Sequence, residues 1–153
     1  MGKLLEHLYI GGMSNATNVK QLRDIGITHV INMAAGYCHT GSNFYDKNVK
    51  YMGINAEDDE GYNIMKHHEE VYKFIEDARK SGGKAFIHCL MGVNRSGSLA
   101  VSYIMVHKHI GPISAARLVR RTRQILLTNR QFQQQLIEFA NAQRLLDLDR
   151  KEI

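Results

Sequence analysis

Two reactive side chains lie six residues apart in the stretch 85–103, which reads AFIHCLMGVNRSGSLAVSY. Cys89 follows an apolar run typical of a buried strand, and Arg95 stands where an apolar pattern of helical spacing begins. A thiolate is a nucleophile, and a guanidinium is a planar fork that matches two oxygens of a phosphate. On one short loop, the two side chains indicate nucleophilic attack on a phosphoryl group.

The loop between the two side chains is expected to bind the phosphate. A tight turn from a strand into a helix directs successive backbone N–H groups inward, and Gly92 relieves crowding there. The helix dipole would also favour the thiolate of Cys89 and lower its pKa. The alternative, that Cys89 is only a small buried hydrophobic residue, leaves Gly92 and Arg95 unexplained. The expected phosphate-binding residues are Leu90, Met91, Gly92, Val93, Asn94 and Arg95.

This chemistry also requires a general acid. The leaving oxygen must be protonated, and a water molecule must later be deprotonated, which one carboxyl group on another loop can do. The candidates are Glu57, Asp58, Asp59 and Glu60, which follow the third predicted strand. For those that are not the acid, a solvated acidic turn is the alternative interpretation.

The elements that must position these residues alternate along the chain. Strands are expected at residues 8–10, 28–33, 49–55 and 84–88, and helices at 14–25, 63–80, 96–109, from 112 onward and 129–146. On one face of the helix predicted at 63–80 we expect His67, Val71, Phe74 and Ile75. Alternating strands and helices predict an α/β fold with a largely parallel sheet. Ligands of such sheets bind at the carboxyl ends of the strands, where Cys89 lies.

The composition favours a soluble, intracellular protein. The chain has 153 residues and only two cysteines, so a disulfide framework is not expected. No apolar run approaches a membrane span and no signal peptide is visible, so we expect a cytoplasmic or nuclear location and no membrane association. The net charge of +5 suits an anionic partner, although a basic surface can also serve solubility alone.

The motif His88-Cys89-x-x-Gly92-x-x-Arg95-Ser96 resembles that of the cysteine-dependent protein tyrosine phosphatases. More narrowly, the chain is similar to the small atypical dual-specificity phosphatases of the VHR type. Further matching segments are 8–11, 26–32, 43–45, 51–54 and 103–105. The resemblance implies a single-domain protein tyrosine phosphatase-like α/β fold, with a mostly parallel sheet flanked by helices, and one catalytic domain over residues 1–153.

The resemblance also implies a role for each residue of the motif. Cys89 would attack phosphorus to form a phosphocysteine, and Arg95 would hold the phosphoryl oxygens. Ser96 would stabilise the thiolate, and His88 would orient the loop, although His88 can equally be a satisfied core histidine.

Outside the motif, the resemblance selects an acid and a rim residue. The pair Asn63-Ile64 selects Asp58 as the general acid, with Asp59 as the second choice. Arg123 best matches an arginine that borders the pocket in the similar enzymes, although each arginine in its stretch could also lie on a solvated helix face.

The implied function is a phosphatase that acts on phosphotyrosine and on phosphoserine or phosphothreonine in proteins. Asn94 and the basic charge leave an RNA 5′-triphosphatase as an alternative hypothesis. However, Leu90, Met91 and Ser96 depart from the pattern of those enzymes. Nucleic acid is therefore not the expected partner. The third hypothesis, a phosphoprotein-binding pseudophosphatase, is disfavoured because Cys89 and Arg95 are both kept.

No cofactor or metal is expected for this reaction. Histidines occur next to one another or near a cysteine at several places, including His107 with His109. None of these groups has zinc-site spacing with enough ligands.

Overall fold

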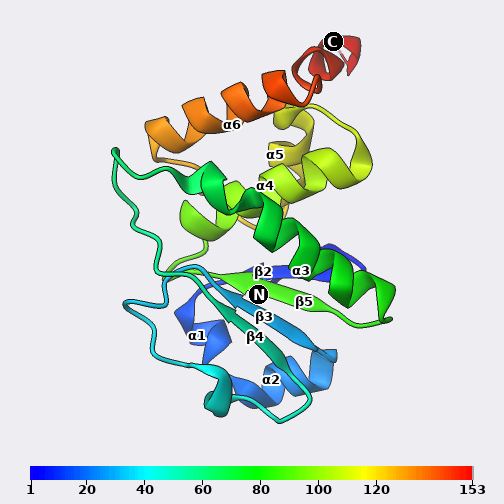
Figure 1. Cartoon of the computed structure of the whole chain (residues 1–153). Coiled ribbons are helices and arrows are strands. Elements are labelled where there is room, and N and C mark those ends of the chain that lie inside the picture. The colour runs from blue at the N-terminus through cyan, green and yellow to red at the C-terminus, as the bar shows by residue number, and fades with distance from the viewer. Residues whose placement is uncertain (153) are drawn as a thin grey trace.

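A five-stranded sheet lies at the centre of the molecule (Figure 1). The computed structural model describes residues 1–152, and its described side chains exclude Ser42 and residues 150–152. The strands lie in the order β1, β2, β5, β3, β4. The last four run parallel, and β1 pairs antiparallel with β2. Their bounds are β1 Gly2–Leu5, β2 Leu8–Gly11, β3 His29–Asn32, β4 Lys50–Gly53 and β5 Ala85–His88.

Helices cover both faces of the sheet, as expected for this class of fold (Figure 1). Two short helices, α1 Met13–Ala16 and α2 Val19–Ile25, lie on one face. The other face carries α3 His68–Lys80, α4 Arg95–Lys108, α5 Pro112–Arg120 and α6 Arg130–Ala142. Within residues 1–152 there are also three 3₁₀ segments: η1 Ser42–Phe44, η2 Ile64–His67 and η3 Leu146–Glu152. Each face has its own apolar core, and the larger one lies under α3 to α6. No helix in the described part of the chain is long and apolar enough to cross a bilayer.

Helix α4 runs through the larger core and holds the end of the loop that carries Arg95. Every residue of α4 from Arg95 to Met105 is buried. Small side chains at its start allow neighbours to approach closely; a Cβ atom on Gly97 would lie 2.6 Å from Cδ1 of Leu126. Because the helix packs against α3, α5, α6 and the sheet, its N-terminus has a fixed position at the carboxyl edge of β5.

Three expectations from the sequence are corrected. The region 14–25 forms two helices because Asn18 accepts a hydrogen bond from Gln21 N–H and starts α2 anew. In the next helical region, His68 faces the core rather than His67, which instead contacts Tyr62 and Glu70 at the surface. The last helix ends at Ala142, and strand β1 was not expected because its four residues are too short to show a pattern.

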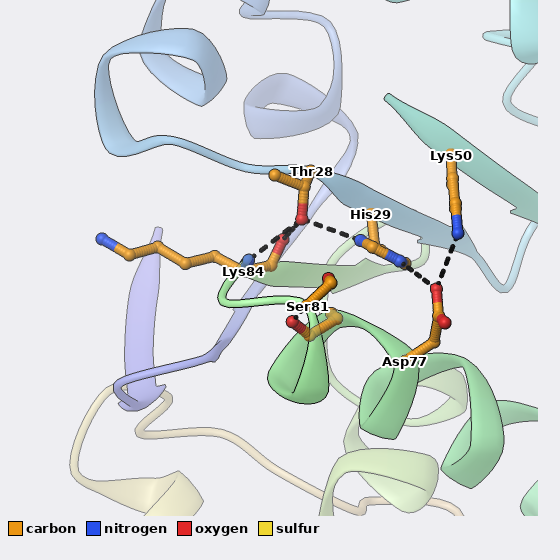
Figure 2. Close-up of polar contacts among 7 residues, drawn as sticks. Thr28, His29, Lys50, Asp77, Ser81 and Lys84 are labelled. Atoms are coloured by element: carbon orange, nitrogen blue, oxygen red, sulfur yellow. Dashed lines mark hydrogen bonds and ion pairs between the residues drawn. The ribbon is translucent and has the colours of Figure 1, made fainter. Parts of the chain in front are cut away.

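A polar network fastens α3 to the amino ends of the strands, opposite the edge that carries Cys89 (Figure 2). His29 is 3% exposed, and its Nε2 lies 2.7 Å from Oδ2 of Asp77 on α3. The same carboxylate oxygen accepts a hydrogen bond from Nζ of Lys50 at 2.9 Å. On the other side of the ring, Nδ1 of His29 lies 2.7 Å from the hydroxyl of Thr28, which also bonds the backbone of Lys84.

Replacement of Asp77 by Ala is expected to lower the melting temperature at pH 7, because it leaves buried Nε2 of His29 without its partner. Hydrogen bonds from His29 and Lys50 hold the pKa of Asp77 below its ordinary value of 3.8. This stabilisation is therefore present above about pH 4 and is lost as the pH falls through the lowered pKa. Thermal unfolding of both proteins between pH 7 and pH 2 should show the difference shrinking in acid.

The matched control for that variant is Asp24→Ala, which removes an exposed ion pair with Lys20 within one helix. A loss of melting temperature as large in Asp24→Ala as in Asp77→Ala would contradict a special role for the buried histidine.

Candidate active site

The loop from Cys89 to Asn94 connects the end of β5 to the start of α4. Gly92 has φ 72°, and a Cβ atom there would lie 2.7 Å from the carbonyl oxygen of Gly11. Only glycine therefore lets the loop rest against the end of β2. The backbone N–H of Met13 donates to the carbonyl of Leu90 at 2.8 Å, and that of Leu127 donates to the carbonyl of Val93 at 3.1 Å. These contacts fix the loop from two sides.

The thiol of Cys89 lies at the base of this loop and is 3% exposed. Its Sγ lies 3.2 Å from Oγ of Ser96, and the backbone N–H of Gly92 donates to it at 3.2 Å. Burial alone raises the pKa of Cys89, but hydrogen bonds from Ser96 and Gly92 and the charge of Arg95 together bring it below 9.0. The surroundings of the sulfur thus favour the thiolate, which is the nucleophilic form.

His88 supports the loop from the core. The ring is fully buried and stacks on Phe86 at 5.3 Å between centroids, and Nδ1 lies 3.1 Å from the carbonyl of Cys89. Burial lowers the pKa of His88 to about 4, so the ring is neutral at physiological pH. His88 is thus a core histidine that holds the backbone of Cys89 through Nδ1, while its buried Nε2 has no partner among the described groups.

Arg95 brings a buried cation to the same place. Its side chain donates from Nη1 to the carbonyl of Ala56 at 3.1 Å, and its Nε has no partner among the described groups. The ring of Tyr37 lies 5.5 Å from the guanidinium carbon, and the Tyr37 hydroxyl donates to Glu57. One donor of the guanidinium is therefore unused beside Cys89, which suits an anion.

A cavity of about 400 Å³ brings the nucleophile, the cation and one carboxylate together. Its lining residues are Asp58, Cys89, Leu90, Met91, Val93, Asn94, Arg95, Ile125 and Thr128. Met91 and Ile125 are 75% and 65% exposed, so the mouth of the cavity is partly apolar. The sequence did not indicate that Ile125 and Thr128 line the cavity, because only the folded structure brings their segment beside the loop that begins at Cys89.

Asp58 is held over the cavity by two side-chain amides. Nδ2 of Asn94 donates to Oδ2 of Asp58 at 3.0 Å, and Nδ2 of Asn129 donates to Oδ1 at 3.1 Å. Asn129 also begins α6, because its side-chain oxygen accepts from the N–H groups of Gln131 and Phe132. Asp59 accepts from the N–H of Gly61 and lines a neighbouring hollow that Asp58 also borders, but it is not among the described residues that line the cavity of Cys89. The geometry favours Asp58 as the acid.

Arg123 lies beneath the loop rather than on its rim. Its Nη2 donates to the carbonyl of Ile10 at 3.2 Å, and its Nε lies 3.4 Å from the position that a Cβ of Gly92 would take. Ile125 and Thr128 line the cavity, and Arg123 is not among its described lining residues. The nearby arginines 120 and 121 are exposed, as a solvated helix face requires.

Known proteins resemble this chain in sequence and in structure. The sequence pattern of the dual specificity phosphatase catalytic domain matches residues 8–142. Human dual specificity protein phosphatase 22 is 36% identical over 91% of this chain and 73% of its own length. A probable rhodanese domain-containing dual specificity protein phosphatase from Dictyostelium discoideum is 35% identical over 88% of this chain. This chain spans only 12–27% of the length of that protein and of two other curated relatives.

Solved structures agree with the sequence matches. The crystal structure of DUSP15 has a TM-score of 0.83 and 31% identity, and the match covers 95% of this chain and 91% of that one. The crystal structure of human DUSP28 has a TM-score of 0.82 over 94% of this chain and 98% of its own; at 22% identity it supports the fold alone.

Substitution of Ser96 by Ala is expected to raise the pKa of Cys89 by about 1–2 units, since a hydrogen bond to a charged group contributes about 1.5–3 kcal/mol. The pH dependence of the rate of alkylation by iodoacetamide measures this pKa. Ser102→Ala is the control, because Ser102 is buried further along α4, where it contacts His68 and Leu99. An alkylation profile unchanged by Ser96→Ala would contradict the role of this hydroxyl.

Proposed function

The chain belongs to the dual-specificity phosphatase family, and we propose that it hydrolyses phosphotyrosine and phosphoserine or phosphothreonine in proteins. One observation carries the proposal: a buried thiol with a lowered pKa shares a cavity with Arg95 and Asp58. The two free cysteines suit a reducing compartment, and we propose a cytoplasmic or nuclear location. The proposed partners are phosphorylated proteins.

In the first step, the thiolate of Cys89 attacks phosphorus. A P–S bond forms while the P–O bond to the leaving group breaks, and Asp58 gives its proton to the leaving oxygen. The unused Nε of Arg95 and the N–H groups of the loop bind the remaining phosphoryl oxygens. The product is a phosphocysteine and a free hydroxyl group on the substrate.

In the second step, water replaces the sulfur. Asp58, now ionised, accepts a proton as the water oxygen bonds to phosphorus, and the P–S bond breaks. The departing thiolate again receives hydrogen bonds from Ser96 and from the N–H of Gly92. Inorganic phosphate leaves, and both side chains regain their starting protonation.

Asn94 was one reason to consider the RNA 5′-triphosphatase hypothesis. We propose that it instead has a role in the protein phosphatase reaction. Its amide contacts Asp58 directly and also binds Thr128 and the N–H of Asn129. It is thus a positioning residue for the proposed acid. The partly apolar mouth formed by Met91 and Ile125 suits an amino-acid side chain better than a triphosphate.

A panel of three substrates tests the function. We expect turnover of a phosphotyrosine peptide and a phosphothreonine peptide, little release of phosphate from 5′-triphosphorylated RNA, and no activity in Cys89→Ser. Free phosphate is measured under identical conditions for each. Turnover that persists in Cys89→Ser would overturn the mechanism, and a preference for the RNA would overturn the substrate class.

The role of Asp58 is tested with leaving groups of different basicity. Asp58→Asn is expected to reduce kcat for an alkyl or phenyl phosphate about 100-fold or more, because a basic leaving oxygen needs a proton. An aryl phosphate with an acidic leaving group should be much less affected.

Asn94→Ala should give a smaller loss with the same dependence on the leaving group, and Asp59→Asn serves as the matched control. Equal slowing of good and poor leaving groups in Asp58→Asn would assign the proton transfer to another residue.

A further inference from the structure

Three side chains with metal-binding atoms meet at the far end of α4. They are His7 in the turn between β1 and β2, Glu76 on α3 and His107 in the last turn of α4. Each offers one ligand atom, and these atoms all lie within 4.8 Å of one another. The three side chains are partly buried, with 14% of Glu76 and 26% of His107 exposed. Water and ions can therefore reach them.

Tyr103 holds two of these side chains in place before any ligand binds. Its hydroxyl donates to Oε2 of Glu76 at 2.7 Å and lies 2.7 Å from Nε2 of His7. The ring of Tyr103 also stacks on His107, with centroids 5.3 Å apart and planes 13° apart. The two imidazoles meet edge to face at 5.1 Å. These contacts gather the three side chains in one place, and an ion on Oε2 of Glu76 would replace the Tyr103 hydroxyl there.

We propose that His7, Glu76 and His107 form a binding site for a divalent transition metal ion, Zn²⁺ being the best match. Two imidazoles and one carboxylate are a donor set that Zn²⁺ accepts, with water in the fourth position. Tetrahedral ligands of zinc lie roughly 3.3 Å apart. Nδ1 of His107 already lies 3.8 Å from Oε2 of Glu76, and the widest spacing must shorten by at most roughly 1.5 Å. Rotation of the partly exposed His107 and Glu76 side chains supplies this movement.

The protonation states of the ligands also suit a cation. Burial lowers the pKa of both His7 and His107, so the neutral, metal-binding form prevails at physiological pH. Hydrogen bonds from Arg79 lower the pKa of Glu76 to about 2, so its carboxylate is ionised. Arg79 binds both oxygens of that carboxylate. A metal on Oε2 would displace the contacts from Nε of Arg79 and from the Tyr103 hydroxyl, and leave the bond from Nη2 to Oε1.

The position of the proposed metal site indicates a structural rather than a catalytic role. His107 follows Arg95 by twelve residues on α4, which corresponds to about 18 Å along the helix. A bound ion there would not reach substrate at Cys89. It would join the β1–β2 turn to α3 and α4, and so stabilise the folded chain.

Metal binding is tested on the tag-free Cys89→Ser protein, because the thiol of Cys89 is itself a ligand for soft metals. We expect excess Zn²⁺ to raise the melting temperature by about 5 °C or more at 100 times its Kd, and Mg²⁺ to have no effect. Co²⁺ should give the visible absorption of a tetrahedral site. Turnover plays no part in either measurement, so the result is independent of the proposed function.

Two further variants locate the site. His107→Ala should abolish both the Zn²⁺ shift and the Co²⁺ absorption, whereas His39→Ala, which removes an exposed histidine elsewhere, should leave both unchanged. Glu76→Gln should weaken the binding of both ions while keeping the shape of the side chain. The absence of any shift in the parent protein would overturn the proposal, as would an equal shift in His107→Ala.

Discussion

A sulfur atom that must carry negative charge inside the protein is the constraint on which this structure depends. Burial of Cys89 opposes ionisation of its thiol. The fold offsets this effect with hydrogen-bond donors that are held in fixed positions. The hydroxyl of Ser96 is fixed because α4 is buried, and the N–H of Gly92 is fixed because the loop rests on β2. The larger core thus has a chemical purpose: it keeps these donors from relaxing away from the sulfur before substrate arrives.

Asp58, the proposed acid, is held by different means from the thiol. Asp58 is exposed, and amides from the loop and from the start of α6 hold it. Neither amide places a charge beside this carboxylate. Arg95, the buried cation of the site, instead donates to the carbonyl of Ala56 and lines the cavity.

Sequence reasoning succeeded where the relevant residues are contiguous. The strand, loop and helix around Cys89 and Arg95 form one local unit, so their spacing alone predicted a shared cavity, which the structure contains. It failed where partners come from distant segments. Nothing in the spacing of Asp58, Asn94 and Asn129 predicts that their side chains meet, and the same holds for the three proposed metal ligands. The choice of His67 as the histidine of that face was wrong because His67 ends the 3₁₀ turn η2, whereas His68 begins α3 and is buried on the same face as Val71 and Ile75.

The cap of α6 has a consequence for how such an enzyme can diversify. Asn129 uses its side-chain oxygen to start a helix and its side-chain nitrogen to hold the proposed acid. Nucleophile strength, by contrast, is set within the β5–α4 unit. The two parts are not independent, because Leu127 and Asn129 also bind the loop at Val93 and Asn94. A substitution at residue 127 or 129 would therefore act on the proposed acid and on the phosphate-binding loop together.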